Sequence, residues 1–281
     1  MANQWVVLHR VNMESGAPVD SVRTDRAGRY RFRVTWDTTS IYFMGTDWQD
    51  IAYLTQPIEG RTPMDTAETL VVWDTTRVGV PLTVAQRHFI IRLPEASTGR
   101  RVLEFLVLQN REHATRVGTG PSGPTWSGRL PTGAFQFEMG ESDVSAEAVR
   151  SAEGSVQVMA PVPPGERQLL YTYVLPGGDR TLDITLDHPV ERVTVLLEDT
   201  AATLVSGPLT DRGIEVFEDA PFRIFDGTVT EPGTSISVRF TVGRGLSEGT
   251  MAGLLVMGVV ILVTIVVIIR RRALAPEPPT P

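Results

Sequence analysis

The residue types that most often do chemistry are few and scattered in this sequence of 281 residues. Cysteine and lysine are both absent, which excludes thiolate nucleophiles, disulfides, Schiff bases and a P-loop lysine. No GxSxG nucleophile elbow occurs. The four histidines have neither HxH nor HExxH spacing, so structural or surface roles are favoured over a metal site: His9, His88, His113 and His188. We therefore expect no catalytic residue, no metal site and no cofactor.

Acidic residues in the second half offer the main alternative, because a carboxylate pair could serve a glycoside hydrolase. The candidates are Asp187, Glu191, Glu198, Asp199, Glu215, Glu218 and Asp219. Their mixture with arginines is more typical of solvated strand faces and turns. Tryptophans could likewise stack on sugars or on a partner, although core packing is favoured for them: Trp36, Trp48, Trp73 and Trp126.

A glycine-rich stretch at positions 118–123 reads GTGPSG and formally matches the dinucleotide-binding pattern GxGxxG. Pro121 interrupts it and Pro124 follows, so no helix N-terminus is available to hold a pyrophosphate. The net charge of −7 also argues against nucleic acid as a partner, because phosphate binding needs a basic surface. The stretch is predicted to be a loop between strands.

One segment, 251–269, reads MAGLLVMGVVILVTIVVII and carries no charge. About 20 apolar residues in a helix span the roughly 30 Å hydrocarbon core, so we predict a single transmembrane helix with the lipid bilayer as a partner. Gly249 and Gly253 have the GxxxG spacing that permits close helix approach, which leaves a dimer open.

The arginines after this segment predict its orientation. Arg270, Arg271 and Arg272 follow it directly, which places the tail, 270–281, in the cytoplasm and everything before the helix outside. Such a topology needs an export signal, yet the sequence opens with MANQWVVLHRVN, which is not one. Tail anchoring would explain this but conflicts with the three arginines. We favour a start that lies too far downstream, or a fragment.

The region before the helix reads as all-β. Short apolar or alternating runs recur every 8 to 14 residues between Gly, Pro, Asp and Ser, as in β-sandwiches and barrels. Tyr30–Val34 alternates strictly and is predicted to be a strand, and Val144–Ala152 is the best candidate for a short helix. We expect one or two β-sandwich domains, at 1–95 and 100–243, then a stalk at 244–250.

Residues 15–32, SGAPVDSVRTDRAGRYRF, resemble the carboxypeptidase regulatory-like domain, a transthyretin-like β-sandwich with a carbohydrate-binding-like fold. The residues that match are Gly16, Pro18, Val19, Thr24, Asp25, Gly28, Tyr30 and Phe32. Asp25 to Gly28 would form a tight turn in which Gly tolerates positive φ, and Tyr30 and Phe32 would then point together into the core. The family usually has one more strand before this point, which agrees with a truncated N-terminus.

The resemblance implies display, folding support or ligand contact, because such domains are not themselves enzymes. The leading hypothesis is a non-catalytic, membrane-anchored protein of the bacterial cell envelope, with an envelope protein or a glycan as its partner. Two alternatives stay open. One is an accessory subunit of an envelope membrane complex, in which the helix itself contacts neighbours. The other is a hydrolase that processes carbohydrates or peptides.

Overall fold

The computed structural model describes residues 1–13, 15–62, 69–95, 99–120, 122–217 and 219–241. Within these ranges the protein is all-β, apart from one short 3-10 helix, η1 (Ala146–Ala148). None of the helices in the described part of the chain is long and apolar enough to span a bilayer. The predicted stalk, transmembrane helix and tail, with Arg270, Arg271 and Arg272, lie outside the described residues.

The chain forms two compact units. Among the described residues, unit 1 comprises those within 1–79, 112–117 and 161–164, and unit 2 comprises those within 80–111, 118–160 and 165–241. The boundary predicted near residue 95 therefore lies at 79/80 instead. The reason is hydrogen bonding: β7 (Thr83–Glu95) pairs along its length with β8 (Gly99–Asn110), so the run that was assigned to the first domain belongs to the sheet of the second.

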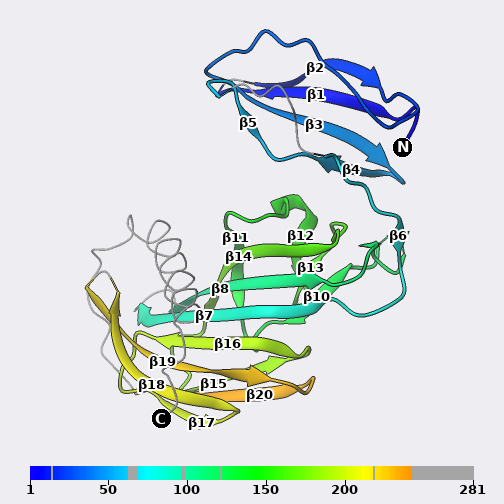
Figure 1. The fold of residues 1–281 in the computed structure, drawn as a ribbon. Coiled ribbons are helices and arrows are strands. Elements are labelled where there is room, and N and C mark those ends of the chain that lie inside the picture. Colours follow the sequence, from blue (N-terminus) through cyan, green and yellow to red (C-terminus); the bar gives the residue numbers. More distant parts are fainter. Residues whose placement is uncertain (14, 63–68, 96–98, 121, 218, 242–281) are drawn as a thin grey trace, which may run out of the picture. The chain divides into compact units, whose positions relative to one another are not determined.

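Unit 1 is built on an antiparallel sheet with the strand order β2-β1-β3-β4, and β5 also pairs with β3 (Figure 1). Its strands are β1 (Trp5–Val11), β2 (Gly16–Arg23), β3 (Ile41–Trp48), β4 (Ile51–Leu54) and β5 (Ile58–Glu59). A short parallel pair, β6 (Thr75–Thr76) and β9 (Thr115–Arg116), completes the unit. The core lies on one face of the sheet, where Val6, Leu8 and Tyr42 are buried.

The segment 30–34 is not a strand, contrary to the prediction, because it has no ladder partner among the described residues. Its side chains nevertheless alternate as the sequence pattern indicates. Tyr30, Phe32 and Val34 are half-buried and pack on the sheet, whereas Arg31 and Arg33 are exposed. The period-two pattern thus predicted which face is buried, since that depends on extended backbone rather than on hydrogen-bonded pairing.

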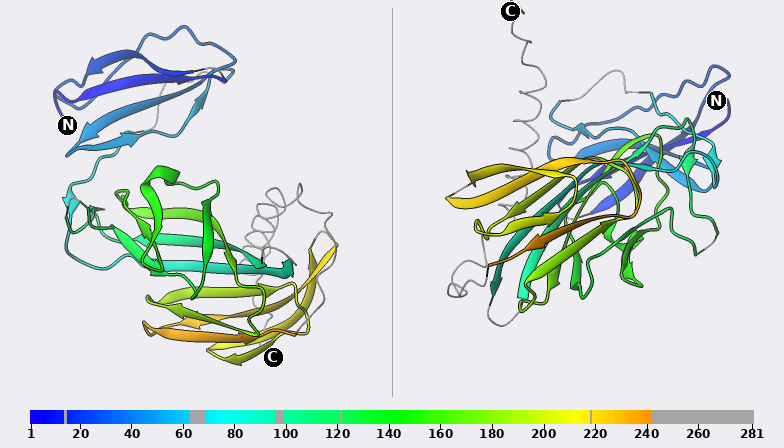
Figure 2. Two further views of the ribbon diagram at one scale, coloured as in Figure 1. Left: turned by 180° about the vertical axis from the view of Figure 1, so that it is seen from behind. Right: turned by 90° about the horizontal axis from the view of Figure 1, so that it is seen from below.

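Unit 2 is organised around a seven-stranded sheet with the order β11-β14-β8-β7-β16-β19-β18 (Figures 1 and 2). Its further strands are β11 (Phe135–Met139), β14 (Gly165–Leu175), β16 (Val190–Leu197), β18 (Leu209–Phe217) and β19 (Ala220–Val229). All neighbours are antiparallel except β7 and β16, which run parallel. In β7 the consecutive residues Phe89, Ile90 and Ile91 are all buried, as expected for a strand that is covered on both faces.

Two three-stranded sheets accompany the large one in unit 2. The first contains β10 (Trp126–Arg129), β13 (Ser155–Val158) and β12 (Val149–Ala152), and the second contains β15 (Thr181–Leu186), β20 (Thr234–Arg239) and β17 (Thr203–Ser206). The helix predicted at Val144–Ala152 is wrong beyond η1. Its second half is β12, which forms a hairpin with β13 through Glu153 and Gly154, both at positive φ (52° and 70°).

Candidate functional site

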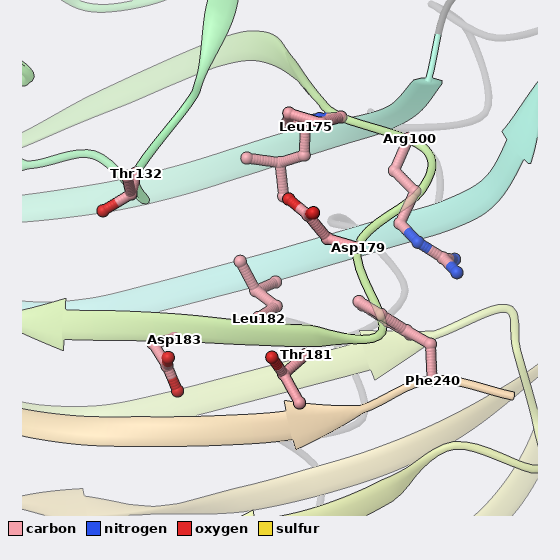
Figure 3. A pocket seen from close by; sticks show the side chains of 9 residues that line it. Arg100, Thr132, Leu175, Asp179, Thr181, Leu182, Asp183 and Phe240 are labelled. Atoms are coloured by element: carbon pink, nitrogen blue, oxygen red, sulfur yellow. The ribbon is translucent and has the colours of Figure 1, made fainter.

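A pocket with a volume of about 140 Å³ lies in unit 2, where the start of β8, the end of β14, β15 and the segment after β20 meet (Figure 3). Its floor is formed by the buried side chains of Arg100, Leu175, Leu182 and Phe240. Its rim is exposed and polar, and it includes Thr132, Asp179, Thr181 and Asp183. The hollow thus combines an apolar wall, one buried cation and two exposed carboxylates.

Gly99 brings β8 and β14 together at this point. It has a φ of 108°, which favours glycine, and a Cβ atom there would lie 2.2 Å from the carbonyl oxygen of Leu175. In the antiparallel ladder Arg100 lies directly opposite Leu175. The backbone approach that only glycine permits therefore places the Arg100 side chain beside the end of β14, at the floor of the pocket.

The turn after β14 and the end of β20 supply the other walls. Strands β15 and β20 are paired over their whole length, and the backbone N–H of Phe240 donates to the carbonyl oxygen of Arg180 at 2.8 Å. This bond holds Phe240 next to the β14–β15 turn, which carries Asp179. Two residues after β15 begins, Asp183 points to solvent while its neighbour Leu182 is buried, as strand alternation requires.

Arg100 is buried, with 3% of its surface exposed, and has few polar partners. Its Nη1 donates to the carbonyl oxygen of Arg92 at 3.5 Å, and its Nε has no hydrogen-bond partner. No carboxylate of the described residues lies within 4.0 Å of its guanidinium nitrogens. Instead the guanidinium carbon lies 3.7 Å from the centre of the Phe240 ring, a cation–π contact.

Burial lowers the pKa of Arg100, and the charge of nearby Asp199 partly offsets this effect. Asp199 is not free to turn towards the arginine. Its two carboxylate oxygens accept hydrogen bonds from the backbone N–H and the hydroxyl of Thr241, at 2.9 and 2.7 Å. A guanidinium remains charged in proteins under these conditions, so the floor of the pocket carries a buried cation that is only partly compensated.

A second buried arginine, in the same unit, has a contrasting environment. Arg87 Nε lies 2.6 Å from Glu104 Oε1, and 1% and 0% of these two side chains are exposed. Glu104 also accepts hydrogen bonds from the hydroxyls of Tyr171 at 2.6 Å and Tyr173 at 3.1 Å. Arg87 Nη2 donates to the carbonyl oxygen of Arg129. We call Arg87, Glu104, Tyr171 and Tyr173 the core ion-pair network.

The electrostatics of this network follow from its burial. Burial disfavours the charged form of Arg87, but the interactions with Glu104, Tyr171 and Tyr173 together outweigh it, so the pKa of Arg87 is raised. Burial and the Glu104 carboxylate both raise the pKa values of Tyr171 and Tyr173 well above the usual range. Both phenols therefore remain neutral donors. Because each member already has its partners, the network satisfies itself and offers nothing to a ligand.

The residues of the family-like motif stay together in unit 1 and have local roles. Gly16 and Pro18 are exposed on β2, and Thr24 accepts from the Gln4 N–H and donates to the Met1 carbonyl oxygen. The predicted turn is confirmed: Gly28 has a φ of 77°, and its N–H donates to the Asp25 carbonyl oxygen. Asp25 caps the turn by accepting from the N–H groups of Ala27 and Arg29, which lowers its pKa.

The other candidate residues are dispersed. Asp187 accepts from the Arg129 N–H, Glu191 pairs with Arg111, and Glu198 pairs with Arg92. Within the described residues, no group of three or more His, Asp or Glu side chains could hold a metal ion. Three tryptophans pack against aromatic neighbours, as favoured from the sequence: Trp36 on Tyr42, Trp73 on Tyr53, and Trp126 on His188.

Comparisons with known proteins add little to this site. No protein-family model and no curated protein matches the sequence. Among solved structures, the chain is similar to a mutant two-domain M1 zinc metallopeptidase bound to L-arginine, at a TM-score of 0.34 and 13% identity. The match covers 57% of this chain and 42% of that one, so this chain spans less than half the length of that protein. A TM-score of this size does not establish a shared fold.

Proposed function

We propose that the protein is a non-catalytic, membrane-anchored protein of the bacterial cell envelope whose β-sandwich domains bind a ligand or partner. The observation that carries the proposal is the uncharged segment 251–269, which is followed directly by Arg270, Arg271 and Arg272. In the proposed topology this segment is a single transmembrane helix, the β units are extracytoplasmic and the tail is cytoplasmic.

The carboxypeptidase regulatory-like resemblance of residues 15–32 supports a display role for the first domain. The turn at Asp25–Gly28 and the packing of Tyr30 and Phe32 on the sheet are compatible with it. In unit 2, the pocket supports binding rather than reaction. Its one buried charged side chain is Arg100, which attracts anionic groups but cannot act as a general base, because a guanidinium stays protonated.

A hydrolase is the second candidate, and one observation favours it: Asp179 and Asp183 line the same pocket. Two facts weigh against it. Both carboxylates are exposed, whereas the general acid of a glycosidase is typically shielded from water. The volume of about 140 Å³ is close to that of a benzene-sized cavity, too small for the linked sugar rings on both sides of a scissile bond.

The anchor is tested by expressing the full chain behind an export signal and adding protease to intact spheroplasts. The β units should be degraded and the protein should sediment with membranes. A deletion of 251–281 should release the protein, and replacing the three arginines with alanine should reduce the fraction in this orientation. Protection of the β units in the unaltered chain would overturn the proposed topology.

The same expressed chain can distinguish an accessory subunit from a protein that the helix merely anchors. A chain in which 251–269 is replaced by a poly-Leu helix keeps the anchor but loses every specific helix contact, including the Gly249–Gly253 spacing. Unchanged recovery of partners by detergent pull-down with this variant would favour anchoring. Loss of a partner with the helix replaced would favour the subunit role.

A further inference from the structure

The pocket of unit 2 contains both signs of charge in separate places. Arg100 supplies a buried cation, which lies against the Phe240 ring, and its Nε lacks a hydrogen-bond partner. Asp179 and Asp183 supply carboxylates at the exposed rim, on the β14–β15 turn and on β15 (Figure 3). A buried donor without an acceptor is unfavourable, so an incoming acceptor that reaches Arg100 gains more than it would at the surface.

This arrangement discriminates between ligands by charge. A simple anion would be attracted to Arg100 but would have to pass two carboxylates at the rim. A simple cation would be attracted to the rim and repelled by the floor. A molecule with a carboxylate at one end and an ammonium group at the other meets a complementary charge at both ends.

Size restricts the ligand further. A cavity of about 150 Å³ holds a molecule of about benzene size, and this pocket has about 140 Å³. Leu175, Leu182 and Phe240 offer an apolar wall beside the charged groups. We propose that the pocket binds a small zwitterionic amino acid, with its carboxylate on Arg100 and its ammonium group towards Asp179 and Asp183.

This inference deepens the binding role proposed above and rests on it. It assigns Arg100 the role of carboxylate anchor and the two aspartates the role of ammonium recognition. Thr132 and Thr181 at the rim add hydroxyl groups that can donate or accept hydrogen bonds. A short aliphatic or hydroxyl side chain fits the remaining space, whereas a large side chain does not.

Calorimetry and ligand-observed NMR on the detergent-solubilised full chain test the proposal, with glycine, acetate and methylammonium as probes. We expect glycine to bind at least about tenfold more tightly than either single-charge probe, because two charge-assisted contacts form together. Acetate binding as tightly as glycine would overturn the zwitterion assignment, and so would methylammonium binding as tightly. Absence of glycine binding would overturn the proposal as a whole.

Variants assign the two ends separately. Asp179→Asn and Asp183→Asn remove exposed charges, so the fold is retained, and each should weaken glycine binding several-fold without weakening acetate binding. Arg100→Met should abolish the binding of both. Glu215→Gln, an exposed carboxylate on β18 outside the pocket, is the matched control and should change nothing.

The outcome stays informative in two further cases. If Arg100→Met does not fold, the two aspartate variants alone test the proposal. It would be contradicted if both variants bound glycine as tightly as the unaltered chain does. Membrane sedimentation and protease sensitivity of the same variants report on the proposed function separately. If the unaltered chain sediments with membranes but does not bind glycine, only the ligand assignment is overturned, and the proposed membrane topology is retained.

Discussion

Two arginines of unit 2, Arg87 and Arg100, are almost equally buried, yet they differ in how well their charge and hydrogen bonds are satisfied. Arg87 is 1% exposed and meets a carboxylate at 2.6 Å, whereas Arg100 is 3% exposed and meets an aromatic ring and one distant carbonyl oxygen. Burial alone therefore does not identify a site. The two arginines differ in how many of their hydrogen-bonding positions the fold fills, and a position that stays open can be filled by a ligand.

The largest expected loss of stability is at Arg87, whose hydrogen-bonding positions are filled by the core ion-pair network. Arg87→Met leaves Glu104 as a buried carboxylate without its cation, and removing one partner of a buried pair typically costs about 3–5 kcal/mol. Urea unfolding followed by tryptophan fluorescence should show this loss in the free energy of unfolding.

The control for Arg87→Met is the double variant Arg87→Met/Glu104→Met. It removes both charges, so it should recover part of the lost stability, although Tyr171 and Tyr173 then lose their acceptor. A single variant that unfolds at the same urea concentration as the unaltered protein would show that the core ion-pair network contributes nothing.

A third buried basic group is His88, and burial favours the neutral form of its imidazole. It is 1% exposed, and burial together with the positive charge of Arg192 lowers its pKa from 6.5 to about 4. The unfolded state therefore binds more protons between these values. The contribution of His88 to the free energy of unfolding is therefore fully present above pH 6.5. It decreases by about 3 kcal/mol as the pH falls to about 4.

Unfolding curves between pH 4 and 7 check this prediction. His88→Phe keeps an aromatic ring against Phe105 and removes the titration, so its stability should vary less over that range. The histidines at positions 9, 113 and 188 are common to both proteins and cancel in the difference. An identical pH dependence in the two proteins would contradict the assignment to His88.

The sequence predicted the kind of fold better than it predicted this pair of arginines. Alternation at Tyr30–Val34 and the turn at Asp25–Gly28 are local properties, so short patterns reveal them. The pairing of β7 with β16 joins residues about a hundred positions apart, Val84 with Val190, and no local pattern encodes it. The domain boundary was missed for a different reason. The strands β7 and β8 are neighbours in sequence and pair with each other, but the prediction placed a boundary between them.

The pocket is invisible in the sequence for a related reason. Arg100 follows what reads as a linker, Asp179 lies in a glycine-rich turn, and Phe240 comes after the last strand. Only the fold brings them together. A local signal did exist at Gly99, because a glycine at the start of a predicted strand indicates close backbone approach, but that signal does not specify what approaches.

A solvent-exposed arginine–carboxylate pair can be compared with the buried pair of Arg87 and Glu104. Arg29 Nε lies 3.0 Å from Asp25 Oδ2, the same chemistry as the core pair, but both side chains are exposed. Arg29→Ala should leave the unfolding transition unchanged, because exposed pairs are screened and their ordering offsets the gain. In the same turn Gly28→Ala should cost about 1–2 kcal/mol, since its φ is 77°.

Both variants are measured by the same urea unfolding. A Cβ atom at position 28 would also lie 2.8 Å from the Met1 nitrogen, so the terminus must shift in Gly28→Ala and not in Arg29→Ala. If Arg29→Ala were the more damaging of the two, side-chain charge rather than backbone conformation would hold this turn together.

At Arg100, unlike Arg87, we expect only a small effect on stability, and the difference between the two positions is the test. Arg100→Met replaces a poorly compensated buried charge with an apolar chain of similar length, so the change in the free energy of unfolding should lie within about 1 kcal/mol of zero. The same substitution at Arg87 is expected to be several-fold more costly. Equal losses at both positions would mean that Arg100 is held by the fold as firmly as Arg87 is. A near-neutral effect at Arg100 would mean that this arginine is retained for something the fold does not need, which is what a ligand-binding residue predicts.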